Sequence, residues 1–366
     1  MADPILIGII DDGVGSRDAR ESGGKAGLYQ QLETDMRLGV SRSRVARGLD
    51  RDVEFVHAEG IGLPSGTAFA VERAVEDLVG RGVLLIIGPA TGDNAIAVTH
   101  LADRYETAMI NWSASERARS EWMFHMQVGS HENESILMAR HLADKGARRI
   151  GVVYDASPIG KRHLDFFEDE CRILGIGIGA RLSISPIATD AAEVVDELER
   201  FDPEGYVYMG LGWAGRELAK ALADVDRSAP RVMNAAGMRG ADPEYARDID
   251  GWVYPDMYSD SNRLLNDLRS ELGDGRRRLG GLAFGFDIGQ LIAEAVTRAP
   301  ELTRLGIREG LERVKLVPAA SGHDGTTLGF GRWEREALKG DYLVMRRWED
   351  GTSVELPVPN RDGLER

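Results

Sequence analysis

Short apolar runs alternate with longer amphipathic stretches along most of the chain, and this alternation constrains the fold more than any other feature of the sequence. In the first half, strand-like runs fall at 5–10, 52–57, 83–87 and 108–110. Helical spacing of apolar residues follows the first three of these runs, at 29–40, at 68–79 and from about 94. Successive strand and helix pairs of this kind predict a parallel sheet with helices on both faces.

The same alternation starts again near residue 132. Expected helices at 132–145, 161–174, 190–201 and 215–225 alternate with expected strands at 149–154, 180–184, 205–209 and 231–234. We therefore predict an α/β protein with two Rossmann-like parallel sheets. Beyond residue 250 the pattern changes to a strand at 251–254, a long helix at 282–298, a helix at 303–314 and a β-hairpin within 342–356.

The charge balance excludes two classes of partner. The 366 residues contain 45 Lys and Arg against 60 Asp and Glu, a net charge of −15. Such a charge repels a phosphate backbone and an anionic lipid surface. No segment approaches the roughly 18 uninterrupted apolar residues that a membrane span needs. We expect no nucleic-acid partner and no direct membrane insertion.

The cellular compartment is not decided by the sequence. Residues 1–4 lead directly into the first apolar run, without the basic region, long apolar region and cleavage site of a signal peptide. Cys171 is the single cysteine, so an intramolecular disulfide is impossible and neither an oxidising nor a reducing compartment is favoured. We expect either a cytoplasmic protein or one whose signal peptide is not part of this sequence.

One glycine motif favours an enzyme. Gly210, Gly212 and Gly215 have the GxGxxG spacing between a strand and a helix, as a dinucleotide-binding turn requires. Against this interpretation, the next strand ends in Asn234 rather than in an acidic residue, and Trp213 would crowd a pyrophosphate. An NAD(P)-dependent enzyme is kept as an alternative to a simple turn whose helix N-terminus faces a ligand.

Other catalytic and metal-binding patterns are weak. Ser321, His323 and Asp324 lie too close together in sequence to converge as a catalytic triad. The histidines at 57, 100, 125, 131, 141 and 163 show no short ligand spacing. We expect no catalytic residue, no metal and no cofactor.

Polar and aromatic residues gather instead at the carboxyl ends of the expected strands, where open parallel sheets bind their ligands. In chain order these are Asp11 and Asp12; Thr91, Asp93 and Asn94; Trp112, Ser113 and Ser115; residues 155–159; Trp213; and residues 235–238. Hydroxyls, helix N-termini and indoles together indicate a binding cleft.

The order of motifs resembles a known family. The opening Ile-Gly-Ile-Ile strand, Leu85-Ile-Ile-Gly-Pro89, Met109-Ile-Asn-Trp-Ser-Ala-Ser115, Val152-Val-Tyr-Asp155 with Gly160, and Gly325-Thr-Thr-Leu-Gly-Phe330 with 342–351 follow one another across nearly the whole chain. This series is similar to the type I periplasmic binding proteins of the branched-chain amino acid (Leu/Ile/Val) group, the solute receptors of ABC transporters.

The resemblance implies a two-lobed architecture and a transport function. One lobe would comprise 1–124 and 257–329 and the other 125–256 and 330–366, with three crossovers near 124–128, 254–258 and 327–330. The lobes would enclose a ligand by hinge closure, and a transporter permease would be the protein partner. The protein would be periplasmic or lipid-anchored outside the cytoplasm. A cytoplasmic ligand-sensing regulator of the same fold is the alternative.

The resemblance also assigns ligand-binding residues. Thr91, Gly92, Asp93, Ser113 and Ser115 would hold the polar end of the ligand, with Trp112 beside them. Ile159, Trp213 and Ala236 would contribute from the second lobe. Phe286, or Phe284, would come from the long helix by rough alignment.

The expected ligand departs from the family pattern. Amino acid binders of this family place an acidic residue near position 236 to neutralise the ligand's ammonium, and Ala236 and Gly237 cannot do so. We expect an apolar, aromatic or steroid-like ligand with hydroxyl or carboxylate groups. Asp11 or Asp12 could still supply a counter-charge, so a branched-chain amino acid stays open as an alternative ligand.

Overall fold

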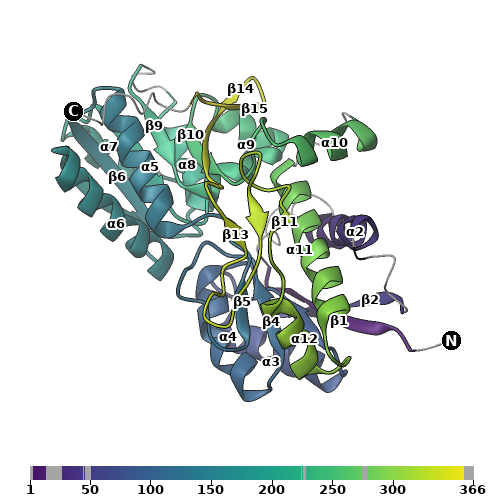
Figure 1. Cartoon of the computed structure of the whole chain (residues 1–366). Coiled ribbons are helices and arrows are strands. Elements are labelled where there is room, and N and C mark those ends of the chain that lie inside the picture. The colour runs from purple at the N-terminus through teal and green to yellow at the C-terminus, as the bar shows by residue number, and fades with distance from the viewer. Residues whose placement is uncertain are drawn as a thin grey trace. The chain divides into compact units, whose positions relative to one another are not determined.

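The computed structural model divides the chain into two compact units, and each is described by itself (Figure 1). It describes residues 3–13, 27–43, 45, 51–223, 225, 228–273 and 279–357. Unit 1 comprises Met1–Val128 and Tyr258–Tyr342, and unit 2 comprises Gly129–Met257 and Leu343–Arg366. Both units are therefore assembled from segments that are far apart in the sequence.

Unit 1 is built on a parallel sheet with the strand order β2-β1-β3-β4-β5. Its first segment contains β1 (Ile5–Asp11), α2 (Gly27–Arg42), β2 (Val53–Glu59), α3 (Ala68–Gly80), β3 (Leu85–Ile87), α4 (Gly92–Arg104), β4 (Ala108–Asn111) and β5 (Met123–His125). Its second segment contains α10 (Arg263–Leu272), α11 (Leu279–Arg298), α12 (Arg304–Glu312) and a small antiparallel sheet of β11 (Val317–Pro318), β12 (Thr327–Leu328) and β13 (Leu338–Lys339).

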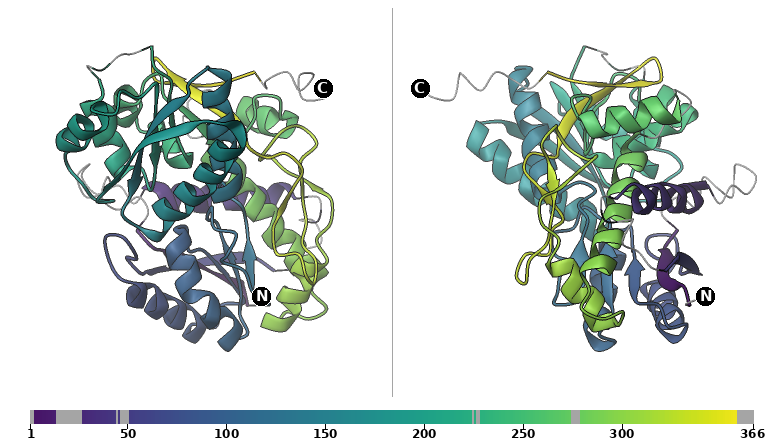
Figure 2. Two further views of the ribbon diagram at one scale, coloured as in Figure 1. Left: turned by 90° about the vertical axis from the view of Figure 1, so that its left-hand side faces the viewer. Right: turned by 45° about the vertical axis from the view of Figure 1, so that its right-hand side comes forward.

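Helices from both segments cover the sheet of unit 1. Figure 2 shows α3 and α4 on one side of the strands and α11 and α12 on the other. Helices α2 and α11 cross closely because glycines lie at the contact. A Cβ added at Gly39 would stand 2.1 Å from the Phe286 carbonyl oxygen, and one at Gly289 would stand 2.1 Å from the Met36 carbonyl oxygen. The second segment is thereby fixed against the first.

Helix α11 is the one described helix that is long and apolar enough to cross a membrane. It is nearly all buried inside the protein, and its described residues from Leu282 to Val296 lie in the core. Burial in the core accounts for the apolar composition of α11, because a helix without a solvent-exposed face can be hydrophobic all round.

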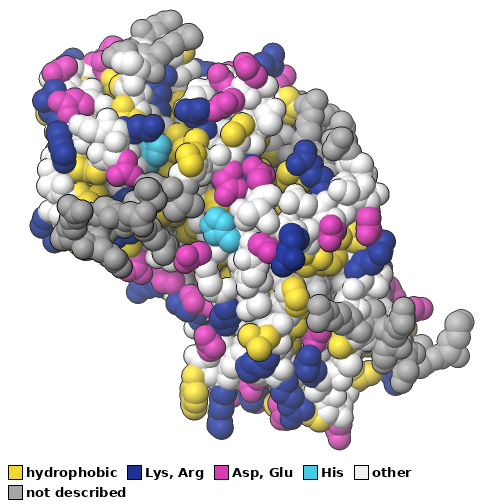
Figure 3. Space-filling model, turned by 45° about the horizontal axis from the view of Figure 1, so that its top comes forward, with side chains coloured by type: hydrophobic (Ala, Val, Ile, Leu, Met, Phe, Trp, Pro, Cys, Tyr) yellow, Lys and Arg dark blue, Asp and Glu magenta, His cyan; other side chains and the backbone are white. Residues whose placement is uncertain are grey.

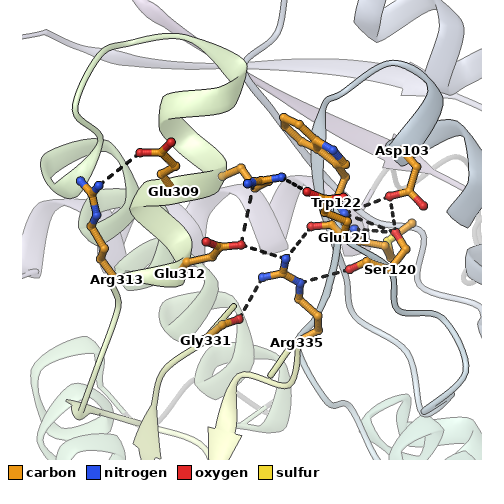
Figure 4. Close-up of polar contacts among 11 residues, drawn as sticks. Asp103, Ser120, Glu121, Trp122, Glu309, Glu312, Arg313, Gly331 and Arg335 are labelled. Atoms are coloured by element: carbon orange, nitrogen blue, oxygen red, sulfur yellow. Dashed lines mark hydrogen bonds and ion pairs between the residues drawn. The ribbon is translucent and has the colours of Figure 1, made fainter. Parts of the chain in front are cut away.

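A buried arginine ties the end of the second segment into unit 1 (Figure 4). The Arg335 guanidinium lies 4.4 Å from the centre of the Phe124 ring and pairs with Glu312 at 2.9 Å. It also donates to the carbonyl oxygens of Ser120 (3.1 Å), Glu121 (2.7 Å) and Gly331 (2.9 Å). These contacts join the turn before β13 to the strand β5.

The third crossing between the units comes later than the sequence predicted. Residues 327–330 were expected to be the crossover and 330–342 to belong with the second unit. The strand β12 instead pairs with β11 and β13 inside unit 1, and the chain leaves this unit only after Tyr342. Backbone pairing with β13 and the anchored Arg335 hold this segment. The other two breaks, after Val128 and after Met257, fall at the end of and within the expected crossovers.

Unit 2 contains a larger sheet in the order β15-β14-β10-β9-β8-β6-β7. The strands from β10 to β7 are parallel, and β14 and β15 add an antiparallel hairpin. In chain order its elements are α5 (His131–Asp144), β6 (Arg149–Asp155), α6 (Pro158–Leu174), β7 (Gly177–Ile184), α7 (Ala192–Glu199), β8 (Gly205–Met209), α8 (Trp213–Ala221), β9 (Arg231–Met233), the 3-10 helix η2 (Ala235–Ala241), α9 (Pro243–Asp248), β10 (Val253–Asp256), β14 (Val344–Glu349) and β15 (Thr352–Glu355).

Each face of this sheet carries its own hydrophobic core. Along β8, Tyr206 and Tyr208 join a core with the helices α7, α8 and α9, whereas Val207 and Met209 join another with α5 and α6. Alternate residues of a strand point to opposite faces, so the two cores lie on opposite sides of the sheet. Burial on both faces explains why the strand sequences read as continuous apolar runs. The prediction of an α/β fold with parallel sheets is confirmed.

The surface carries charges of both signs. On the face shown in Figure 3, acidic and basic side chains are interspersed, with hydrophobic side chains between them. The acidic side chains on this face are therefore not gathered in one block.

Candidate functional site

Asp12 follows the last residue of β1 and is almost completely buried. Its carboxylate accepts hydrogen bonds from the Tyr29 hydroxyl at 2.8 Å, the Asn94 amide at 2.9 Å and the backbone N–H groups of Thr91 at 3.0 Å and Ala90 at 3.3 Å. Four donors occupy its two oxygens. The structure therefore gives Asp12 a role inside unit 1, as the anion at the N-terminus of α4.

The other residues at this helix start are placed around that carboxylate. Thr91 is the N-cap of α4 and makes no side-chain capping bond, and Gly92 begins the helix in a buried position. Asp93 is half-buried in the first turn. The N–H of Thr91 donates to Asp12, so this donor at the helix start is already bonded within unit 1.

The loop after β4 is held by its own side chains. Ser113 donates to the Asn111 side chain at 2.8 Å and accepts from the Ser115 N–H at 3.2 Å. His125 donates through Nε2 to the Ser113 carbonyl oxygen at 2.7 Å, and burial lowers the pKa of His125 to about 4. The Ser115 hydroxyl is completely buried and makes no hydrogen bond among the described residues. Of the two serines, only Ser115 keeps an uncommitted hydroxyl.

Trp112 lies in an aromatic cluster of unit 1. Its indole stacks on Phe284 with 5.1 Å between ring centres and meets the edge of Tyr29 at 6.1 Å. The indole N–H is buried without a hydrogen-bond acceptor in the described part of the chain. Phe286, the residue assigned from the resemblance, packs instead in a core with Tyr258 and Leu282. Phe284 and Phe286 lie two residues apart on α11 and therefore point to different sides of the helix, and it is Phe284 that stacks on Trp112.

In unit 2, the glycine motif after β8 is filled by side chains of the protein itself. Asp155, at the end of β6, accepts from the Tyr208 hydroxyl at 2.6 Å and from the Leu211 N–H at 2.7 Å. A Cβ at Gly210 would lie 2.1 Å from the Asp155 carboxyl carbon. The N–H of Gly212 donates to the Tyr208 hydroxyl at 3.0 Å. A pyrophosphate would need these same N–H donors, so the geometry does not support the dinucleotide interpretation.

Burial dominates the electrostatics of Asp155. It raises the pKa of this carboxyl to about 6, while the hydrogen bonds from Tyr208 and Leu211 and the charge of Arg239 act in the opposite direction. The same burial, next to the Asp155 charge, raises the pKa of Tyr208. This carboxyl therefore holds the turn at 210–212 rather than offering a charge to solvent.

Trp213 begins α8 directly after Gly212, which adopts the left-handed conformation with φ of +98°. The Arg239 guanidinium lies 5.0 Å from the centre of the indole ring, and its Nε donates to the Leu211 carbonyl oxygen at 2.6 Å. Ala236 is buried next to them in η2. The sequence analysis named Trp213 and Ala236 as candidate site residues but did not name Arg239. In the sequence, only the position of Arg239 three residues after Ala236 could have indicated it.

A buried polar cluster fixes the two loops that carry these residues. The Asn234 side chain accepts from the Gly210 N–H at 3.2 Å and donates to the Gly210 carbonyl oxygen at 3.0 Å and to His163 Nε2 at 3.1 Å. Since His163 Nε2 accepts, its proton lies on Nδ1, toward Ser135 at 3.2 Å. Burial lowers the pKa of His163 to about 3, which keeps this ring neutral.

Glu134 supports the adjacent loop from the start of α5. Its carboxyl accepts from the Ala235 N–H and from the Ser130 N–H, both at 2.7 Å. Burial raises the pKa of Glu134 to about 8, and the nearby Asp256 acts in the same direction. The buried Glu134 side chain therefore fixes the backbone next to Ala236.

Ile159 lies in the first turn of α6, where Ser157 caps the helix through the Gly160 N–H. It is buried. A Cβ at Gly160 would stand 2.2 Å from the Asp155 carbonyl oxygen, so the first turn of α6 is in close contact with the end of β6. This close approach requires glycine and places Ile159 near the end of that strand.

The residues of the rejected triad have structural partners. The N–H of Ser321 donates to Asp287 at 2.8 Å, and Asp324 pairs with Arg263 at 2.8 Å. Among the described residues no group of three or more His, Cys, Asp or Glu side chains could hold a metal ion. The chemistry that the described strand ends offer is hydrogen bonding and aromatic stacking, including the stacking of Arg239 on Trp213.

The predicted residues thus form one set in each unit at the carboxyl ends of parallel strands. Asp12, Thr91, Gly92, Asp93, Trp112, Ser113 and Ser115 belong to unit 1, and Ile159, Trp213 and Ala236 belong to unit 2. Figure 1 labels β1, β4, β6 and β9 among the strands whose ends carry them.

Known proteins identify the architecture. The periplasmic binding protein family matches the chain over residues 23–348. No curated protein is significantly similar to the chain in sequence. Among solved structures, a periplasmic binding protein type 1 from Bordetella pertussis Tohama I is similar with a TM-score of 0.80 at 14% identity, covering 97% of this chain and 100% of that chain.

Two amino acid-binding proteins share the same architecture. The leucine-binding protein LivK from Thermotoga maritima has a TM-score of 0.79 at 16% identity, covering 98% of this chain and 99% of its own. The transporter substrate-binding protein LivJ from Streptococcus pneumoniae, solved with isoleucine, has a TM-score of 0.77 at 15% identity, covering 97% and 99%. At these identities the likeness establishes a common fold. The family match extends over most of the sequence, and the chain therefore belongs to the periplasmic binding protein family, with the type I fold.

Proposed function

We propose that this protein is a solute-binding protein of an ABC transporter that encloses a small organic ligand between its two units by hinge closure. The observation that carries the proposal is the family match over residues 23–348 on a fold of two α/β units between which the chain crosses three times. In such a receptor a ligand that touches both units favours the closed form through its differential affinity. A transporter permease then recognises the closed form.

The proposal includes the location and excludes catalysis. The protein acts outside the cytoplasm, in the periplasm or attached to the membrane by a lipid, and binds its ligand without changing it. The donors of the glycine motif at 210–212 are paired within unit 2, which supports binding over dinucleotide chemistry. A cytoplasmic ligand sensor of the same fold differs in location and partner, so expression of the native gene followed by cell fractionation separates the two.

The ligand class is proposed from the strand-end residues. Aromatic side chains in both units, including Trp112, Phe284 and Trp213, favour an apolar or aromatic body. The buried Ser115 hydroxyl and two indole N–H groups have no hydrogen-bond partner among the described residues, and each suits an oxygen acceptor.

A thermal-shift screen over aromatic acids, sterols, bile acids and amino acids tests the function. A ligand at 100 times its Kd stabilises the protein by about 2.7 kcal/mol. Small-angle scattering with the same ligand should show a smaller radius of gyration. A shift with NAD(P)H and none with any solute class would contradict the proposal.

Trp213→Ala tests the site. We expect ligand affinity to fall by more than about tenfold, or about 1.4 kcal/mol, with the fold retained. Trp333→Ala is the matched control, because Trp333 is 89% exposed in a turn of unit 1. Equal affinity of both variants in titration calorimetry would remove Trp213 from the site.

A further inference from the structure

The carboxylate of Asp12 gives unit 1 an anion of its own at the N-terminus of α4. Its Oδ1 accepts from the Tyr29 hydroxyl and the Ala90 N–H, and its Oδ2 accepts from the Thr91 N–H and the Asn94 amide. All four groups donate and all four are neutral, so no charge among them cancels that of the buried carboxylate. A helix N-terminus at the carboxyl end of a parallel sheet is a common binding place for a ligand anion. We call this place, marked by the N–H groups of Ala90 and Thr91, the anion position of unit 1.

Tyr29 links the anion position to the aromatic cluster of unit 1. Burial, next to the Asp12 charge, raises the pKa of Tyr29, so its hydroxyl stays protonated and donates. The Tyr29 ring meets the Trp112 ring with 6.1 Å between their centres. The backbone N–H of Trp112 donates to the carbonyl oxygen of Pro89 at 3.2 Å, and Pro89 directly precedes Ala90. Trp112 is therefore a neighbour of the anion position.

Trp112 brings an unused donor to the same place. Its side chain is 5% exposed, and its indole N–H is buried without an acceptor among the described residues. Phe284 stacks on the indole at 5.1 Å, and together with Tyr29 it restricts the direction of the N–H. An indole N–H only donates, and a buried donor without a partner is costly. The group that suits this donor is an oxygen acceptor.

The neighbouring charge decides which acceptor fits. A ligand carboxylate accepts from an indole N–H, but here it would lie near the Asp12 carboxylate, and like charges repel strongly in a buried environment. A ligand ammonium is attracted by Asp12, but it has no lone pair for the indole and would compete with four donors that already bond to this carboxylate. A neutral carbonyl, ether or hydroxyl oxygen avoids both penalties.

Resting on the proposed function, we propose that Asp12 is a specificity-determining residue: it fills the anion position, so that the ligand presents to unit 1 a neutral oxygen, which accepts from the Trp112 indole N–H. Asp12 acts through its charge and does not contact this oxygen. Trp112 bonds to it directly.

Removal of the carboxylate tests whether Asp12 fills an anion position. In Asp12→Ala the lost group has the size of formate, so sodium formate should raise the melting temperature by about 3 °C or more above sodium chloride at the same ionic strength. Asp12→Asn removes the charge but leaves the space filled, so formate should change its melting temperature by less than about 1 °C. Asp11→Ala is the matched control and should respond as little, because Asp11 accepts from the neighbouring Gly13 N–H rather than from the start of α4.

Matched ligands with a single polar group test the ligand class. Three acids serve as probes, each with its amide and its primary alcohol: 3-phenylpropanoate, 2-naphthylacetate and 4-methylpentanoate. Titration calorimetry and ligand-observed NMR, at concentrations up to the millimolar range, measure affinity for the full chain. In at least one set the amide and the alcohol should bind about tenfold or more tightly than the acid. In Asp12→Asn this ratio should fall to about threefold or less, because the charge is gone; this variant carries the test if Asp12→Ala does not fold.

The variant Trp112→Phe tests the direct contact. Phenylalanine keeps a ring that can stack on Phe284 but has no N–H, so affinity for the amide and the alcohol should fall about fivefold. Trp122→Phe is the matched control. Trp122 is also buried in unit 1, beneath the Arg308 guanidinium at 4.8 Å, and its replacement should leave affinity within about twofold.

The outcomes separate the inference from the proposed function. Tighter binding of an acid than of its amide, failure of every neutral probe to bind, no effect of formate on folded Asp12→Ala, or an unchanged ratio in Asp12→Asn would each overturn the assignment of Asp12. Equal losses in Trp112→Phe and Trp122→Phe would overturn the contact with Trp112. Binding of leucine with compaction of the protein would overturn the inference and leave the solute-binding function in place, whereas a screen in which no solute class binds would overturn the proposed function itself.

Discussion

Replacing Asp12 by alanine tests whether this carboxylate is part of the framework of unit 1. The substitution removes the acceptor of four hydrogen bonds at the N-terminus of α4. Asn94 has another acceptor in the Leu63 carbonyl oxygen at 3.3 Å, and the Tyr29 hydroxyl can rotate. The N–H groups of Ala90 and Thr91 have no such choice, because the backbone fixes their direction.

The expected loss follows from these unpaired groups. A buried donor left without a partner costs about 1–3 kcal/mol. Two fixed N–H groups, together with weaker bonding of Tyr29 and Asn94, predict a loss of about 3–5 kcal/mol in the unfolding free energy of unit 1. Asp12→Asn keeps one acceptor oxygen and turns an NH₂ group toward a donor, so it should lose about 2 kcal/mol.

Urea unfolding followed by circular dichroism measures the loss, and hydrogen exchange over residues 90–104 locates it. Asp11→Ala is the matched control: its side chain accepts a bond from the neighbouring Gly13 N–H at 3.0 Å and is half-buried. We expect this control to lose less than about 1 kcal/mol. Equal losses for Asp11→Ala and Asp12→Ala would refute the reasoning and return Asp12 to the set of ligand contacts.

Three further predictions concern stability. Burial raises the pKa of Glu134 to about 8, so its contribution is present at low pH and is lost as the pH rises through this value. Between pH 6 and 9 the wild type should therefore lose about 2–3 kcal/mol more unfolding free energy than Glu134→Gln, measured in urea at each pH; parallel curves would contradict it. Gly160→Ala should destabilise unit 2 by about 1–3 kcal/mol because of the 2.2 Å approach of its Cβ, whereas Gly177→Ala, with its nearest contact at 3.4 Å, should cost less; equal melting temperatures would show that α6 can shift. Arg335→Gln should cost about 3 kcal/mol in urea, since it leaves Glu312 without this partner, and Arg332→Gln, on an exposed ring, is its control; similar midpoints would mean that the buried pair contributes little.

The sequence predicted the sheets well where burial determines the residue pattern. The strands β6 and β8 are covered on both faces, and a strand that is buried on both faces has an unbroken run of apolar residues in the sequence. The strands β11, β12 and β13 have two residues each and show no period. Their existence depends on tertiary contacts such as those of Arg335, which explains why the third crossing was placed too early.

The candidate site was harder to predict because its hydrogen bonds join distant segments. Nothing near Asp12 in the sequence shows that Tyr29 and Asn94 will converge on it. The glycine spacing at 210–215 satisfies a dinucleotide pattern, yet Asp155, from an earlier strand, fills the space in front of the first glycine. The spacing of glycines indicates which backbone conformations are possible. It does not indicate which side chain or ligand fills the space that those glycines leave.

The charge of the ligand illustrates the same limit. Ala236 indicates only that one carboxylate is missing, and a missing group is compatible with neutral, anionic and cationic ligands alike. The structure adds Arg239 at this place, beside Gly212 and over Trp213. Asp12 bonds to the helix start in unit 1, whereas α8 begins without a side-chain cap. The ligand screen with acids and amino acids, rather than the residue pattern, therefore decides the charge of the ligand.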